Sequence, residues 1–275
     1  MPTPTMHLVV AEEMLRRKDF SLAARRLLDQ QQGPFLLGHT APDVRTVSGQ
    51  RREACHFYAV PRMSDQPAYC ALFDAHPLLS HVEALSPSRA AFVAGYIAHL
   101  LLDELWLDDV FRRFFLQDWG PLHERMFLHN VLRTWMDHRA QERLGGTAAQ
   151  ILRKAEPDGW LPFVADEHLR IWRDWLVQQL GADQGMETAD VLARRMGISP
   201  ERIEAVAGSA AKMEHRIFRR FPRSDLRAFE EMGYRRSVLL VDWYIAGGAH
   251  GQSEPMPSGL SVHRSTDCQP THRQR

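Results

Sequence analysis

Apolar positions recur with helical spacing along most of the chain. This pattern predicts helices over residues 6–28, 68–75, 87–115, 121–144, 165–181, 186–198, 199–221 and 225–248, and a short helix within 76–88. No run alternates apolar and polar residues in the way of a half-buried strand. We therefore expect an all-α fold, a multi-helix bundle of about seven to nine helices.

The segments between and after these helices are rich in turn-forming residues. Residues 29–57 contain Gly33, Pro34, Pro42 and Gly49, and we expect this segment to be mostly loop. A single helical domain is expected over residues 1–246. The remaining residues, 247–275, are polar and rich in Pro, Gly and Ser, which predicts a disordered C-terminal tail.

The net charge and the cysteine content limit the classes of protein to which this chain can belong. The 275 residues include 34 Lys plus Arg and 34 Asp plus Glu, so no net field favours nucleic acid or an acidic membrane. The three Cys form no Cys-x-x-Cys pair, and a low, odd number of Cys suits a reducing compartment. The N-terminal segment lacks the basic and apolar regions of a signal peptide, and no uninterrupted apolar run reaches about 18 residues. We expect a cytoplasmic protein without a membrane span.

The most apolar segment contains two polar residues that a buried helix has to satisfy. Residues 90–106 read AAFVAGYIAHLLLDELW and place His99 and Asp103 four positions apart, on one helix face. Burying an imidazole and a carboxylate costs free energy unless they are paired or bind a ligand. Their Cβ atoms are expected about 6 Å apart, a gap that a zinc ion with bonds of about 2 Å can bridge.

A glycine on the same helix indicates where further ligands approach. Gly95 lies one turn before His99 and leaves room for a second segment of the chain. The loop that carries Asp43 and His56 is the segment that we expect there.

Three more polar residues, His7, Asp43 and His56, interrupt apolar surroundings in the N-terminal half. With the helix pair they make three His and two Asp, a ligand set that suits zinc. Each also has a purely structural explanation. His7 would then be a surface residue at a helix start, and Asp43 a turn residue. His56 would be a hydrogen-bonded core histidine, and the pair of His99 and Asp103 a buried contact that fixes the packing of the bundle.

The order and spacing of these residues resemble those of the zinc-dependent phospholipase C family, whose relatives include the catalytic domain of GPI-specific phospholipase D and zinc-dependent single-strand nucleases. The shared features are an early helical His, a G-x-x-x-P-D loop, an H-F pair and an AF-x-x-G-[YI]-x-x-H-x-x-x-D-x-x-W helix. Here they are His7, GHTAPD at 38–43, HF at 56–57 and AFVAGYIAHLLLDELW at 91–106. The match covers roughly the first 110 residues of the chain.

The resemblance implies a helical bundle of the zinc-dependent phospholipase C type that holds one to three zinc ions. Asp43, His56 and His99 would form one site together with Asp103. His7 would join Asp103 in a second site, so that the Asp103 carboxylate bridges two ions. We expect one or two ions to be bound.

A third site in this family needs two further His and a Glu downstream. Five residues are candidates for additional ligands: Asp109, His123, Glu124, His129 and Asp137. The expected H-x-x-x-E pair is missing, because the residue four positions after His129 is Arg133. The sequence therefore predicts the first two zinc sites more clearly than a third.

Together these residues predict a zinc-dependent phosphate ester hydrolase, similar to phospholipase C, that acts through a metal-activated water. Asp43 is the expected catalytic residue, as a shared ligand and candidate proton acceptor. The expected substrate is a small phosphate ester or a phospholipid, because the neutral charge does not favour nucleic acid. His39, in the same loop, is expected to be a surface residue, with contact to substrate as the alternative.

Two other classes of protein are alternatives to this hypothesis. Helical metal phosphohydrolases of the HD type centre on an adjacent His-Asp pair, and this sequence has only the reversed pair, Asp137 and His138. A non-enzymatic helical metal-binding or scaffold protein stays open, because the third site is incomplete. Trp160, Trp172 and Trp175 are expected in the core or an interface and not in a site.

Overall fold

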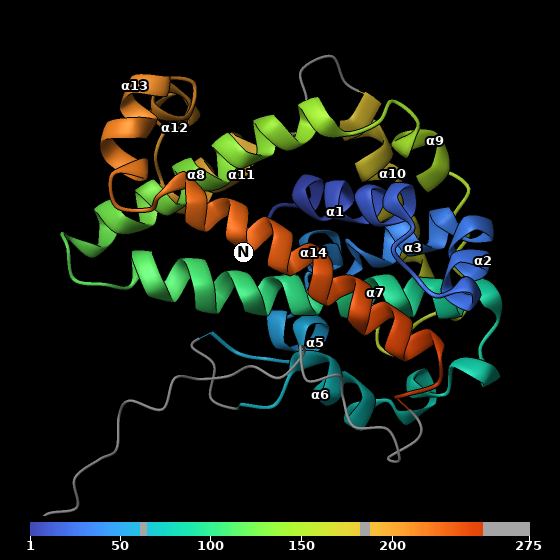
Figure 1. The fold of residues 1–275 in the computed structure, drawn as a ribbon. Coiled ribbons are helices and arrows are strands. Elements are labelled where there is room, and N and C mark those ends of the chain that lie inside the picture. The colour runs from blue at the N-terminus through green and yellow to red at the C-terminus, as the bar shows by residue number, and fades with distance from the viewer. Residues whose placement is uncertain (61–64, 182–187, 250–275) are drawn as a thin grey trace, which may run out of the picture.

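A computed structural model describes residues 1–60, 65–181 and 188–249 of the chain. Every regular element in these ranges is helical, which confirms the all-α multi-helix bundle (Figure 1). The α-helices are α1 (Pro4–Arg17), α2 (Leu22–Gln30), α3 (Gln32–Gly38), α4 (Arg45–Ser48), α5 (Arg52–His56), α6 (Ala68–Ala75), α7 (Pro87–Leu105), α8 (Leu122–Arg143), α9 (Ala148–Leu152), α10 (Asp166–Gly181), α11 (Thr188–Met196), α12 (Pro200–Ala207), α13 (Ala210–Met213) and α14 (Arg223–Ile245).

Five further helical segments connect them, three of the 3₁₀ type and two of the wider π type. The 3₁₀ segments are η1 (Ala41–Val44), η2 (Pro77–Ser80) and η3 (Val82–Ala84), and the π segments are η4 (Trp106–Phe115) and η5 (Glu214–Phe218). The segment η4 continues α7 without a break in the chain, so the predicted helix over 87–115 is a single long rod. The predicted disordered tail falls mostly on residues 250–275, outside the described residues.

The expectation that residues 29–57 are mostly loop was wrong. This segment contains α3, η1, α4 and α5, each four to seven residues long. Elements of this length show too little periodicity to be recognised from the pattern of apolar residues. The described part of the chain consequently has fourteen α-helices, more than the expected number.

The helix α7 forms the centre of the bundle and supplies two of the site residues. It begins at Pro87, whose fixed backbone suits the first helical position, and Ser86 caps it by accepting a hydrogen bond from the Arg89 amide. Side chains from Ala90 to Leu105 are buried without interruption, so the helix is covered on all sides. In Figure 1, α14 crosses over α7, and α5 and α6 lie below it.

The long rod at 87–115 also has the length and hydropathy of a helix that crosses a membrane. Its most apolar window is completely buried by the rest of the protein. A central core helix gives the same pattern, so this finding is weak support for a membrane span. The expectation of a protein without such a span stays a prediction.

Two glycines allow α3 to lie directly against α7. A Cβ atom on Gly38 would overlap the Phe92 carbonyl oxygen, and one on Gly95 would overlap the Phe35 carbonyl oxygen. The expectation that Gly95 leaves room for another segment is confirmed. The segment in contact is α3 and the start of the following turn, whereas the sequence had suggested the loop with Asp43 and His56. This close packing fixes His39 beside α7.

Candidate metal centre

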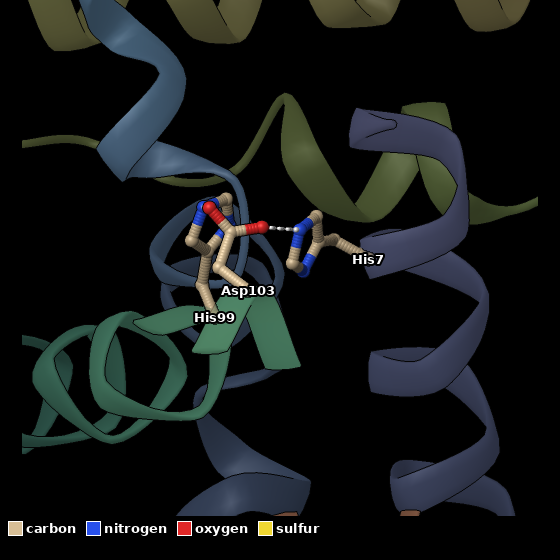
Figure 2. A group of neighbouring side chains, drawn as sticks. All are labelled: His7, His99 and Asp103. Carbon is tan, nitrogen blue, oxygen red and sulfur yellow. Dashed lines mark ion pairs between the residues drawn. The ribbon is translucent and has the colours of Figure 1, made fainter. Parts of the chain in front are cut away.

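Five polar side chains from four elements meet at one point inside the bundle. His7 comes from α1, Asp43 from η1, His56 from α5, and His99 and Asp103 from α7. Figure 2 shows His7 reaching from α1 toward the two side chains of α7. The Asp43 side chain is 23% exposed, and the other four are at most 2% exposed. All five residues that the sequence predicted as zinc ligands therefore lie together.

The ligand atoms stand at separations that a shared metal ion requires. The His7 Nε2 atom is 3.5 Å from Asp103 Oδ1, and the His99 Nε2 atom is 3.7 Å from Asp103 Oδ2. The His56 Nε2 atom is 3.4 Å from Asp103 Oδ2 and 3.6 Å from Asp43 Oδ1. These separations exceed the roughly 2.9 Å of a good N–H···O hydrogen bond. A tetrahedral zinc ion with bonds of about 2.0–2.1 Å holds its ligand atoms about 3.3–3.4 Å apart, close to what is observed.

The Asp103 carboxylate faces different histidines with its two oxygen atoms. Oδ1 faces His7, whereas Oδ2 faces His56 and His99. Ligand atoms of His7, His99 and Asp103 lie within 4.8 Å of one another, and those of Asp43, His56 and His99 do so as well. This division suits a carboxylate that bridges two ions. His99 belongs to both groups, which the resemblance to the phospholipase family did not imply.

Several buried polar atoms at this point have no hydrogen-bond partner. They are both ring nitrogens of His7 and His56, Nε2 of His99 and Oδ1 of Asp103. Buried polar atoms are nearly always hydrogen-bonded, because leaving one unpaired costs about 1–3 kcal/mol. A cluster of such atoms facing one another is what a metal ion would satisfy. The residues present therefore fit the zinc ions that the resemblance implies.

The main chain of His39 orients the ring of His99. The His99 Nδ1 atom lies 2.9 Å from the His39 carbonyl oxygen. A carbonyl oxygen only accepts hydrogen bonds, so this contact assigns the ring proton to Nδ1 and leaves a lone pair on Nε2. The Nε2 atom is the one that faces Asp103. Such a bond behind a metal-ligating histidine fixes its tautomer and its direction.

His39 is not the surface residue that the sequence suggested. Its side chain is completely buried, its ring stands edge-on to Phe35, and its centroid lies 6.0 Å from that of His7. Neither of its ring nitrogens has a hydrogen-bond partner. Burial, together with the nearby His7 and His99, lowers the pKa of His39 well below its usual value. The contact between α3 and α7 buries this residue, and nothing in its local sequence shows that contact.

Arg52 and Tyr58 hold the outer side of the Asp103 carboxylate. The Arg52 guanidinium donates to Asp103 Oδ2 at 2.9 Å and to the Tyr58 hydroxyl at 2.7 Å. The Tyr58 hydroxyl itself is 3.5 Å from Asp103 Oδ2. These contacts fix the carboxylate in the orientation that directs Oδ1 to His7. Neither residue was predicted from the sequence, because an Arg and a Tyr near a His carry no recognisable signal of their own.

Electrostatics keep the carboxylates charged and one histidine neutral. Burial raises the pKa of Asp43 and of Asp103, but the neighbouring His99 and His56 outweigh burial and lower both values. Burial and the adjacent His7 lower the pKa of His99 to about 3. Anionic carboxylates and neutral imidazoles are the forms that bind metal ions. Asp43, Asp103 and His99 are thus in their metal-binding forms at neutral pH.

The candidates for a third set of ligands do not join this cluster. Among the described residues, no group of metal-ligating atoms contains Asp109, His123, Glu124, His129 or Asp137. His129 accepts a hydrogen bond from the Trp106 indole at 3.0 Å and packs against Phe111 and Phe115. His123 is exposed, and Asp137 accepts hydrogen bonds from Gln141 and Thr188.

Comparison with protein-family models, with curated proteins and with solved structures found no significant match. The resemblance to the zinc-dependent phospholipase C family therefore stays a prediction from the motifs in the sequence. The geometry of the five side chains is the observation that bears on function.

Proposed function

We propose that this protein is a zinc-dependent hydrolase of phosphate esters, similar to the phospholipase C family. The observation that carries the proposal is the convergence of His7, Asp43, His56, His99 and Asp103, with buried ligand atoms that lack partners. The metal-like separations of these atoms support zinc, because three His and two Asp suit this ion. The substrate class that we propose is a small phosphate ester or a phospholipid.

Some residues of the site would hold the zinc ions, and others orient the side chains that hold them. His99 and Asp103 form the base of the site on α7, and His7 and His56 close it from two sides. Arg52 and the His39 carbonyl fix the directions of the Asp103 and His99 side chains. When bound, zinc ions lower the pKa of coordinated water to about 7 and stabilise negative charge on phosphoryl oxygens.

Asp43 is the member of the cluster that substrate can approach. Its side chain is the most exposed of the five, and it lines a cavity that opens beside the cluster. Because its pKa is lowered, the carboxylate is anionic and a weak base at neutral pH. This favours a role as a ligand and as the acceptor of a hydrogen bond that orients the attacking water, over complete removal of a proton.

The proposal is tested by metal content and turnover of the purified full-length protein. We expect about one to two zinc ions per chain and hydrolysis of bis(p-nitrophenyl) phosphate or p-nitrophenyl phosphate. Chelation is expected to abolish turnover, and added zinc to restore it. A protein that binds zinc without hydrolysing any phosphate ester would be the non-enzymatic helical metal-binding or scaffold protein. A protein that binds no metal would contradict both proposals.

A further inference from the structure

An arginine-lined cavity opens beside the metal centre. It has a volume of about 210 Å³, and Asp43 contributes to its wall. Four arginines from four helices line it: Arg45 of α4, Arg52 of α5, Arg133 of α8 and Arg195 of α11. We call this space the arginine cavity. Because Asp43 belongs to both, a ligand in the cavity is next to the proposed zinc ligands.

Most of the positive charge in the arginine cavity is uncompensated. Arg52 pairs with Asp103, but no carboxylate of the described residues lies within ion-pair distance of Arg45, Arg133 or Arg195. The Nε atoms of Arg45 and Arg133 are buried and lack hydrogen-bond partners. The Arg133 guanidinium donates to Asn130 Oδ1 at 3.3 Å, but this neutral amide leaves its charge unbalanced. Positive charge held in partly buried surroundings without a counter-ion is costly, so this arrangement favours an anion. Repulsion between Arg133 and Arg195 acts in the same direction, since burial and this neighbour lower the pKa of Arg133 to about 10.

The charge of the cavity indicates what kind of anion fits. Three unpaired guanidinium groups and one carboxylate, that of Asp43, leave a net charge of two positive units. A phosphate monoester carries about −1.5 to −2 charge at neutral pH, whereas a phosphodiester carries only about −1. Guanidinium groups also bind phosphate oxygens through paired hydrogen bonds. The cavity therefore matches a phosphate monoester group better than a diester.

One of these arginines occupies a position where a third metal site would need a ligand. Arg133 follows His129 at the fourth position, the place of the missing Glu of a third metal site. His129 itself is bound to the Trp106 indole. A fixed guanidinium supplies a positive charge beside the two proposed ions without any third ion. The stacked rings of Trp172 and Trp175 form another part of the wall, with centroids 5.0 Å apart. Trp172 lies in the core, as expected, but both residues also line this cavity.

We propose that the arginine cavity binds a phosphate monoester group of the substrate, next to the metal centre. As a statement about substrate, this inference rests on the proposed hydrolase function. As a statement about binding, it rests only on the four arginines. The two statements can be tested separately, because the cavity is lined by residues that are not proposed to hold zinc, apart from Asp43.

The test uses inorganic phosphate as the probe and full-length protein in two forms, zinc-loaded and chelator-treated. Binding is measured by calorimetry for wild type, Arg133→Gln and Arg195→Gln. The matched control is Arg194→Gln, which removes the same charge one position away from Arg195. Both residues are exposed on α11, but Arg194 does not line the cavity. Because Arg195 lies at the exposed rim, its variant keeps the test valid even if Arg133→Gln fails to fold.

We expect chelator-treated wild type to bind phosphate. Arg195→Gln and Arg133→Gln should weaken binding about tenfold or more, because hydrogen bonds to charged groups are among the strongest single contacts. Arg194→Gln should change it less than about twofold, since Arg194 does not line the cavity and acts on the phosphate only as a screened charge at a distance. The inference is overturned if chelator-treated wild type does not bind phosphate, or if Arg194→Gln weakens binding as much as Arg195→Gln.

These results separate the two proposals. Phosphate binding that depends on Arg195, in a protein that takes up no zinc even when zinc is added, would support the arginine cavity and contradict the hydrolase. Zinc-dependent turnover in a protein whose metal-free form does not bind phosphate would support the hydrolase and overturn the inference about the arginine cavity. Glycerol 3-phosphate and vesicles of phosphatidylcholine containing phosphatidic acid then distinguish a free phosphate monoester from a lipid headgroup. Failure of both to bind wild type more tightly than Arg195→Gln would also overturn the cavity.

Discussion

The His99 ring is held by the main chain of His39, through a contact of 2.9 Å between Nδ1 and the carbonyl oxygen. This contact exists because α3 and α7 approach at two glycines, Gly38 and Gly95. The direction of a proposed metal ligand thus depends on helix packing one turn away. Metal affinity and fold stability are expected to change together when that packing is disturbed.

Replacing Gly95 by alanine tests this dependence. The added methyl group would overlap the Phe35 carbonyl oxygen and push α3 and the His39 carbonyl away from α7. We expect a loss of about 1–3 kcal/mol in the free energy of unfolding, as for other overpacked cores. Zinc affinity should fall as well. Urea unfolding of the metal-free protein and zinc titration measure the two effects.

The control for this change is Gly120→Ala. A Cβ atom on Gly120 meets nothing within 4 Å, so this variant adds the same methyl group without a collision. It should leave both stability and zinc affinity near the values of the wild type. Equal losses in the two variants would show that the close approach of α3 and α7 does not matter.

Asp103→Asn is expected to remove the metals while keeping the helical fold. The amide has the volume of the carboxylate but no charge, and the carboxylate is proposed to bridge two ions. We expect loss of most bound zinc and of phosphate ester hydrolysis, with an unchanged circular dichroism spectrum. Elemental analysis and turnover of the purified variant provide the measurements.

Asp108→Asn is the matched control on the same rod. Asp108 pairs with Arg112 near the surface and belongs to no group of proposed ligands. This variant should keep its zinc and its activity. If Asp103→Asn kept the zinc content of wild type, the pair of His99 and Asp103 would be only a structural contact.

Chelation should lower the melting temperature of the wild type. A ligand that binds only the native state stabilises it by mass action, about 2.7 kcal/mol at one hundred times the dissociation constant. For a domain of this size that corresponds to a shift of about 5–10 °C. Differential scanning calorimetry with and without chelator measures it, and Asp103→Asn should show little shift. An unshifted wild type would leave the cluster without a bound metal.

The stability of the metal-free protein should rise with pH between about 4 and 6.5. The pKa of His99 is lowered to about 3 by burial and by His7, whereas an unfolded histidine titrates near 6.5. In this window the unfolded state binds a proton that the native state does not, so stability is lost as pH falls below about 6.5. The low pKa values of Asp43 and Asp103 act below about pH 4, outside the window.

Urea unfolding at several pH values measures this slope. We expect His99→Gln to reduce the slope without abolishing it, because burial also lowers the pKa of His39 and of His129. His138→Gln, which changes a partly exposed histidine paired with Glu204, should keep the slope of the wild type. Stability that does not change between pH 4 and 6.5 would contradict the neutral state of buried His99.

The long central helix and its polar pair could be predicted from the sequence for physical reasons. The segment of residues 87–115 is long and strongly apolar, with Ser86 as its N-cap and Pro87 at its first helical position. Its pattern therefore predicts a helix without ambiguity. His99 and Asp103 stand out because polar residues are rare in such surroundings. His7, Asp43 and His56 interrupt apolar surroundings, but they could be distinguished from structural residues only because their order resembles that of a known family.

The rest of the site arises from packing that no local pattern shows. His39 is buried by the contact of α3 with α7. Arg52 contacts Asp103 from a five-residue helix that is too short to be recognised from the sequence. The arginine cavity combines side chains from the neighbouring helices α4 and α5 with others from α8 and α11, which lie far away in the sequence. Its members look like ordinary surface arginines until the helices are assembled.

The position of the cluster also has a consequence for the kinetics of folding. Its five side chains come from α1, η1, α5 and α7, so no fragment shorter than most of the N-terminal half contains a complete site. Contacts between residues so distant in sequence form late, because loop closure has to precede them. Zinc bound there would contribute little to the transition state for folding and much to the native state. We therefore expect zinc to slow unfolding many times more than it speeds folding. Bound metal would thus give the native bundle kinetic stability.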